Sequence, residues 1–157
     1  MTVHELGKVD MWTLDGDIYV VPTNARGIMG SGLAKDFAAR FPAQSAAYVE
    51  RCKRAEVGAG DAWPEPLGPN GSGNHAYVTF AVTKDEPREP SRQEWVTRAL
   101  DRLFVLASMN MVAPRGMVIL PAIGCGLGGL SFSWLHEKVL DRFDSIPGIE
   151  VGLIDPL

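Results

Sequence analysis

Apolar and polar positions along this chain follow each other in short blocks that predict alternating strands and helices. Short apolar runs bounded by turn residues predict strands, and apolar residues at helical spacing predict helices. The predicted strands are residues 8–12, 18–21, 61–64, 75–82, 117–120 and 149–154. The predicted helices are residues 31–41, 44–54, a segment after Pro90 and residues 131–143. This order of elements predicts an α/β sheet covered by helices on both faces.

Two local signals define where some of these elements start and turn. Residues 68–74 are rich in Gly, Asn, Pro and Ser, so they predict a turn that joins residues 61–64 and 75–82 as a hairpin. Ser91 and Glu94 have the spacing of a capping box, which predicts that Ser91 caps the helix after Pro90.

Composition restricts the class of protein. The 157 residues are 46% hydrophobic and 22% charged, with a mean hydropathy of +0.01, which predicts one globular domain over residues 1–157. No apolar run is long enough to span a bilayer and no signal segment precedes the first strand, so we expect a cytoplasmic protein without membrane contact. Cys52 and Cys125 lack metal-ligand or disulfide spacing, so no metal site is predicted.

The net charge of −4 and the isoelectric point near 5.3 argue against a broad basic surface that follows a nucleic-acid backbone. Recognition of a single modified nucleotide remains compatible with this charge.

Two glycine-rich turns carry the candidate chemistry. Residues 30–32 follow one apolar strand and precede a helix, and residues 124–129 repeat this arrangement later in the chain. Glycine lets the backbone approach an anion, and the free N–H groups at the start of a helix favour negative charge. Two such turns on parallel strands lie at the same carboxyl edge of a sheet. The sequence therefore predicts a ligand with two phosphates.

Residues 9–24, which end in the strand before Asn24, resemble the opening segment of the macrodomain family, the modules that bind ADP-ribose. The resemblance extends over nearly the whole chain and implies a three-layer α/β/α fold with a mixed central sheet. It implies that Asp10 contacts adenine and Asn24 contacts the distal ribose. Val9 stands where the family has a glycine, and Asp17 is expected to lie outside the site.

Within that family, residues 29–34, 41–42 and 83–92 resemble DarG-type antitoxins and the related terminal ADP-ribose glycohydrolases. This similarity implies that Lys84 takes part in removing ADP-ribose and that residues 124–127 form the second phosphate loop. It implies ADP-ribosylated nucleic-acid bases or acidic protein side chains as substrates.

The ADP-ribose contacts implied by the resemblance are Asp10, Met11, Asn24, Ile28, Met29, Gly30, Ser31, Gly32, Leu33, Thr83, Ile123, Gly124, Cys125, Gly126, Leu127 and Gly128. Several of these have a structural alternative. The Asn24 amide could cap its own loop, and Ser31 could be a helix N-cap. Ile28 and Ile123 could flank the distal ribose or belong to the core.

Lys84 has a chemical role that follows from its amine. A neutral amine can attack the anomeric carbon of the distal ribose, or its ring-opened aldehyde, and give a Schiff-base type intermediate that water resolves. Desolvation, or a neighbouring cation such as Arg88 or Arg92, would favour the neutral form. Lys84 could instead hold a phosphate, or be a solvated lysine at the end of a strand.

The second glycine turn departs from the terminal glycohydrolases, which have a catalytic Asp where this chain has Gly128-Gly129. Asp85 or Glu86 could supply the acid or base instead. We expect an enzyme that removes ADP-ribosyl groups from a nucleic-acid base, thymidine in DNA, or from protein side chains. The alternatives are a reader or sponge without turnover and an ADP-ribose 1″-phosphate phosphatase. We expect a monomer with no cofactor, for which ADP-ribose is ligand or product.

Overall fold

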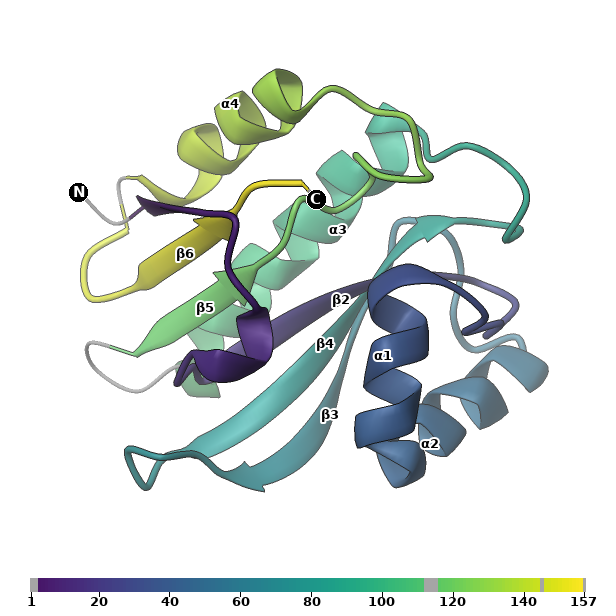
Figure 1. Ribbon diagram of the computed structural model, residues 1–157, viewed down its shortest axis with the longest axis horizontal. Coiled ribbons are helices and arrows are strands. Elements are labelled where there is room, and N and C mark those ends of the chain that lie inside the picture. The colour runs from purple at the N-terminus through teal and green to yellow at the C-terminus, as the bar shows by residue number, and fades with distance from the viewer. Residues whose placement is uncertain (1–2, 112–115, 145, 157) are drawn as a thin grey trace.

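A computed structural model describes residues 3–111, 116–144 and 146–156, and shows a six-stranded sheet (Figure 1). The strand order is β1-β6-β5-β2-β4-β3, in which β3 runs antiparallel to β4 and every other neighbouring pair is parallel. The mixed sheet is therefore confirmed. The strands are β1 Val3–Gly7, β2 Ile18–Asn24, β3 Ala62–Pro69, β4 His75–Lys84, β5 Met117–Leu120 and β6 Glu150–Ile154.

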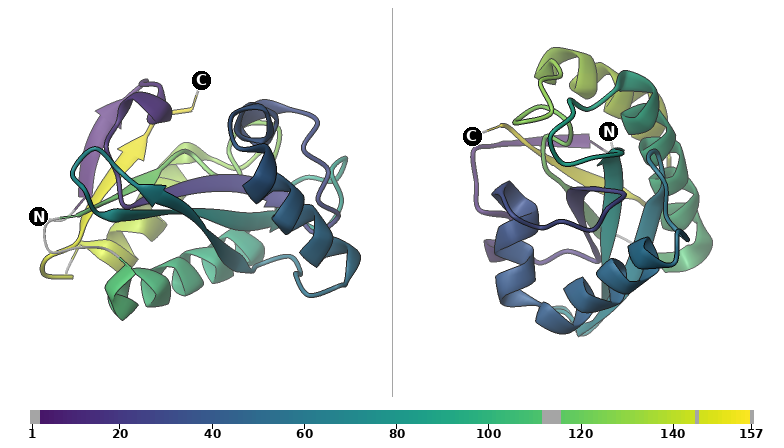
Figure 2. Two further views of the ribbon diagram at one scale, coloured as in Figure 1. Left: turned by 90° about the horizontal axis from the view of Figure 1, so that it is seen from below. Right: turned by 90° about the vertical axis from the view of Figure 1, so that its right-hand side faces the viewer.

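Helices cover both faces of this sheet, which confirms the three-layer arrangement (Figure 2). The elements on one face are α1 Gly32–Arg40, α2 Pro42–Lys53 and the short 3-10 helix η1 Met11–Thr13. The elements on the other face are α3 Gln93–Leu106 and α4 Phe132–Phe143, and the π-helical turn η2 Ala107–Met111 follows α3. No helix of the described residues is long and apolar enough to cross a membrane.

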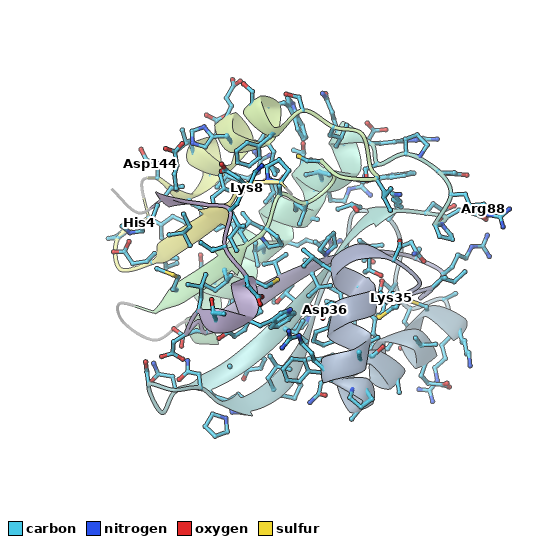
Figure 3. The ribbon with its side chains drawn as sticks, in the orientation of Figure 1. His4, Lys8, Lys35, Asp36, Arg88 and Asp144 are labelled. Atoms are coloured by element: carbon cyan, nitrogen blue, oxygen red, sulfur yellow. The ribbon has the colours of Figure 1, made fainter. Side chains whose placement is uncertain are left out.

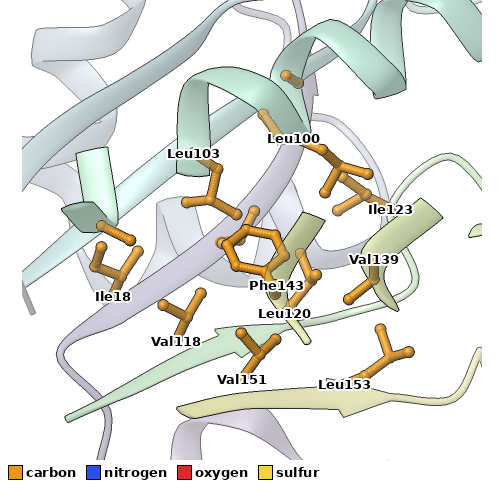
Figure 4. Close-up of a cluster of buried hydrophobic side chains, with 14 of the residues drawn as sticks. Ile18, Leu100, Leu103, Val118, Leu120, Ile123, Val139, Phe143, Val151 and Leu153 are labelled. Carbon is orange, nitrogen blue, oxygen red and sulfur yellow. The ribbon is translucent and has the colours of Figure 1, made fainter. Parts of the chain in front are cut away.

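The core has two parts because side chains of a strand alternate between the faces of the sheet. Ile18 and Val20 of β2 point toward α3 and α4, whereas Val21 points toward α1 and α2. The first part gathers aliphatic side chains around the fully buried Phe143 (Figure 4). The second is aromatic, with the Tyr48 and Phe80 rings stacked at 4.2 Å.

The predicted strand at residues 8–12 is wrong. The first strand is β1, which ends at Gly7, and residues 11–13 form η1. Asp10 caps η1, because its Oδ1 accepts a hydrogen bond from the backbone N of Trp12 at 3.0 Å. A side chain that bonds its own backbone in this way competes with strand pairing.

The predicted capping box at Ser91 is also wrong. The N-cap of α3 is Arg92, and its side chain makes no capping hydrogen bond. Ser91 instead contacts the second glycine turn, where its backbone N donates a hydrogen bond to the Gly128 carbonyl at 3.1 Å. The helix predicted at residues 131–143 is confirmed as α4, and Ser131 caps it by accepting a hydrogen bond from the Trp134 N.

The hairpin of β3 and β4 is confirmed, and its turn is fixed by two aspartates. Asp15 Oδ1 accepts from the Gly71 N at 2.9 Å, and Asp17 Oδ1 accepts from Asn70 Nδ2 at 2.9 Å. Asp17 lies just before β2, at the opposite end of that strand from Asn24. Asp17 is therefore structural, as the sequence predicted.

Candidate functional site

A cavity of about 750 Å³ lies at the carboxyl edge of the sheet, within the range of small-molecule sites. The ends of β2 and β4 contribute Asn24 and Lys84, and both glycine turns border the same cavity. Parallel strands that end at one edge bring these segments together, as expected for an open α/β sheet.

The first glycine turn leads directly into α1. Gly32, Leu33 and Ala34 are the first helical residues, so their amides have no acceptor within the helix. Gly32 has a φ of +59°, which a side chain would strain. Ser31 occupies the N-cap position but its side chain makes no capping hydrogen bond, and it is exposed on the cavity. The turn therefore presents unpaired N–H groups to an anion.

The second glycine turn is closed by its own backbone. The Leu130 N donates to the Gly124 carbonyl at 2.9 Å, and the Gly129 N donates to the Gly126 carbonyl at 3.1 Å. Among the residues that the structure describes, the amides of Gly126, Leu127 and Gly128 have no acceptor. These amides resemble those of the first turn in being free to bind a phosphate oxygen.

Gly128 has no space for a side chain. A Cβ atom there would lie 2.5 Å from the Gly124 carbonyl oxygen and would overlap Ser91 Oγ. Backbone atoms cannot move aside as a flexible side chain can. The absence of an acidic residue at position 128 thus has a steric cause.

The Asn24 side chain closes the loop between β2 and the first turn. Its Oδ1 accepts from the backbone N of Arg26 at 3.1 Å and of Ile28 at 3.2 Å, and its Nδ2 donates to the Ile28 carbonyl at 2.9 Å. The loop-capping alternative is therefore confirmed. Contact with a ribose stays a prediction, for which the second Nδ2 hydrogen is available.

Tyr48 fixes the Asn24 backbone, because its hydroxyl donates a hydrogen bond to the Asn24 carbonyl at 2.9 Å. Burial raises the pKa of Tyr48, so this donor keeps its proton.

Lys84 ends β4 opposite Asn24 of β2. It is half-buried, lines the cavity, and its Nζ donates to the Pro87 carbonyl at 3.4 Å. The two arginines considered as neighbouring cations do not line the cavity. Arg88 projects outward at the periphery (Figure 3), and the Arg92 guanidinium lies 4.6 Å from the centre of the Trp95 ring.

The two acids considered as substitutes for the missing Asp do not line the cavity either. Glu86 pairs with Arg26 at 2.5 Å on the surface, and Asp85 is exposed. The acids on the cavity are Asp10, Asp36 and Asp155. Asp36 accepts from Trp12 Nε1 at 2.8 Å, which ties α1 to η1 and so positions Asp10. No group of three or more His, Cys, Asp or Glu residues in the described part of the chain could hold a metal.

The family model described as Macro domain matches residues 20–135, which include most of β2, both glycine turns and Lys84. The chain belongs to the macrodomain family.

This macrodomain is similar to curated proteins named DNA ADP-ribosyl glycohydrolase. It is 28% identical over 151 residues to that of Mycobacterium tuberculosis, covering 96% of this chain and 41% of the relative. It is 31% identical over 134 residues to that of Thermus aquaticus, covering 85% of this chain and 36% of the relative. The chain thus spans about two-fifths of the length of these two relatives.

Solved structures show the same fold. The macrodomain of Mycobacterium tuberculosis DarG superposes with a TM-score of 0.83 at 25% identity, covering 98% of this chain and 100% of that chain. The macrodomain of Thermus aquaticus DarG gives a TM-score of 0.84 at 27% identity, covering 98% and 99%. These matches confirm the branch of the family that the residues around Lys84 resemble.

Three of the predicted ligand contacts do not line the cavity of the macrodomain. Met29 accepts a hydrogen bond from Ser45 Oγ through its sulfur, Ile123 is 1% exposed in the core, and Cys125 Sγ donates to the Ile123 carbonyl. The core alternative therefore holds for Ile123, whereas Ile28 is 53% exposed and lines the cavity. The remaining predicted contacts line it, although binding by them stays a prediction.

Sequence reasoning missed several residues that line the cavity: Lys8, Thr23, Asp36, Pro87, Ser91, Pro121, Ala122, Ile154, Asp155 and Pro156. Asp155 and Pro156 directly follow β6, so the end of the last parallel strand was a usable signal. Ser91 had no such signal, because its place depends on the contact with the second turn.

The three hydrogen bonds of the Asn24 side chain give a first testable prediction. Replacing Asn24 with alanine removes three hydrogen bonds, so we expect a loss of about 1–3 kcal/mol in the free energy of unfolding and about tenfold weaker ADP-ribose binding. Thermal unfolding and calorimetry measure the two effects. Asn70→Ala is the matched control, because Asn70 bonds Asp17 at the other end of β2 and should lose stability without losing affinity. An Asn24→Ala protein of unchanged stability would contradict a structural role for these hydrogen bonds.

A second prediction concerns the pH dependence of Cys125. Burial raises the pKa of its thiol to about 11, so the native thiol stays protonated and unreactive near neutral pH. We expect its alkylation to accelerate only as the pH approaches about 11, and to be faster in denaturant. Peptide mapping by mass spectrometry follows Cys125 separately from Cys52. Rapid alkylation of the native protein near pH 8, about the ordinary thiol range, would contradict this environment.

Proposed function

We propose that this macrodomain binds ADP-ribose in the cavity and hydrolyses the bond between an ADP-ribosyl group and a nucleic-acid base, with thymidine in DNA as the favoured substrate. The observation that carries the proposal is that two glycine turns with unpaired amides border the same cavity as Lys84. The names of the relatives from Mycobacterium tuberculosis and Thermus aquaticus support a DNA substrate.

Each part of the ligand has a group that suits it. The amides of residues 30–34 and 126–128 suit the diphosphate, since they are unpaired and belong to glycine turns. Asp10 is exposed and lines the cavity next to Met11, where it suits adenine. The distal ribose then lies toward Asn24 and Lys84.

The chemistry assigned to Lys84 is nucleophilic. In its neutral form, Nζ attacks the anomeric carbon, the bond from this carbon to the base breaks, and the ribose ring then opens to give a Schiff base with Nζ. The base leaves with the proton that the attacking amine loses when it bonds the carbon. A second step adds water to the carbon–nitrogen bond of the intermediate, which releases ADP-ribose and restores the amine.

We further propose that the chain is a single macrodomain that acts as a monomer in the cytoplasm. Its proposed role is antitoxin-like: it reverses ADP-ribosylation of DNA or protein and needs no metal or cofactor.

One observation favours a second candidate, an ADP-ribose reader without turnover. Gly128 has no space for an acidic side chain, and Asp85 and Glu86 do not line the cavity. Such a protein would keep the binding groups and lack the acid that assists departure of the base.

The test incubates the protein with single-stranded DNA that carries ADP-ribosylated thymidine, and separately with a protein ADP-ribosylated on acidic side chains. Release of ADP-ribose from the DNA supports the proposed enzyme. Binding of both substrates without release indicates the reader, and failure to bind either contradicts an ADP-ribose site.

A further inference from the structure

The Ser91 hydroxyl is a buried polar group without a partner. Ser91 is 5% exposed, and its Oγ makes no hydrogen bond to any described residue. Buried side-chain hydroxyls in folded proteins nearly always have a partner, so an orphaned one on a cavity points to a missing ligand. Ser91 is one of the residues that line this cavity.

The position of Ser91 is fixed by the second glycine turn. Its backbone N donates to the Gly128 carbonyl at 3.1 Å, and a Cβ at Gly124 would lie 3.6 Å from the Ser91 Cβ. The hydroxyl fills the space that a side chain at position 128 would need. Ser91 therefore supplies a side-chain hydroxyl next to Gly128, which has no side chain of its own.

The neighbours of Ser91 indicate which part of a ligand it meets. Lys84 and Pro87 belong to the same segment of chain as Ser91 and line the same cavity. Phosphate oxygens have the unpaired amides of the two turns as donors. A sugar hydroxyl both donates and accepts hydrogen bonds, as the serine hydroxyl does, so it is the natural partner for Ser91.

We propose that Ser91 Oγ hydrogen-bonds a hydroxyl of the distal ribose and so positions this sugar beside Lys84. The inference rests on the proposed function, because it assumes that ADP-ribose occupies the cavity.

The test compares ADP-ribose with ADP, which lacks the distal ribose, in calorimetric titrations of the wild type and Ser91→Ala. We expect ADP-ribose to bind about 3- to 10-fold more weakly to the variant, the effect of one neutral hydrogen bond, and ADP to bind unchanged. The unfolding temperature of the free variant should not fall, because Oγ has no partner within the protein to lose.

Thr79→Val is the matched control. Thr79 is fully buried, its Oγ1 also lacks a partner among the described residues, and it is not among the residues that line the cavity. Valine keeps its shape, so the control should bind both ligands like the wild type.

Each other outcome has a separate meaning. Equal weakening of ADP and ADP-ribose would show a phosphate contact and overturn the ribose assignment. Unchanged binding of both ligands, or a lowered unfolding temperature without loss of ADP-ribose affinity, would overturn a ligand role for Ser91. A wild type that binds neither ligand would overturn the proposed function itself.

Discussion

Replacing Lys84 with alanine is expected to slow the release of ADP-ribose from ADP-ribosylated DNA by at least about 100-fold and to change ADP-ribose binding by less than about threefold. The reason is that the only hydrogen bond of Nζ to a described residue goes to the Pro87 carbonyl, so its loss leaves the cavity in place. Single-turnover release from DNA, with calorimetry on the same samples, measures both quantities.

Lys84→Arg is the control that separates the two roles of the lysine. Arginine keeps the positive charge but does not act as a nucleophile, because its guanidinium is not deprotonated in proteins. An arginine variant as slow as the alanine variant supports attack by Nζ, and one with most of the activity supports electrostatic help. Release by Lys84→Ala at the wild-type rate would exclude both roles.

Replacing Gly128 with alanine is expected to weaken ADP-ribose binding by about 100-fold or more and to destabilise the fold by about 1–3 kcal/mol. The added Cβ would lie 2.5 Å from the Gly124 oxygen and 2.9 Å from its carbonyl carbon, so the backbone of the second turn must shift. This shift moves the amides that are assigned to the phosphates. Calorimetry measures the affinity, and thermal unfolding measures the stability.

The same turn offers a control for this change. A Cβ at Gly126 meets no atom within 4 Å, and its φ is not in the left-handed region, so Gly126→Ala should fold with wild-type stability. If Gly128→Ala were as stable as Gly126→Ala and bound ADP-ribose equally well, the steric account of this turn would be wrong.

The sequence predicted the architecture and the two turns because these depend on local patterns. Apolar runs located β2, β4, β5 and β6, and glycine next to a helix start located both glycine turns. Asp17 was correctly predicted to lie outside the site, since it holds the hairpin turn.

The predictions that failed required knowledge of tertiary contacts. A residue such as Asp10 can extend a strand or cap a short helix, and the choice depends on how Met11 of η1 packs with Ile119 and Ile154. The neighbours of Lys84 could not be inferred either, because Arg92 binds the Trp95 ring one helical turn away. Ser91 looked like a cap from its spacing, although the Gly128 carbonyl fixes its backbone. In each case a partner distant in sequence, or a competing local contact, decided the outcome.

The most direct test of the account is a titration of isotope-labelled protein with ADP-ribose, followed through the backbone amide resonances. If the diphosphate lies between the two glycine turns, the largest shifts will be at the amides of residues 30–34 and 126–128, which have no acceptor in the described structure. Saturable binding with the largest shifts on another face of the sheet, and none at these two turns, would contradict the site.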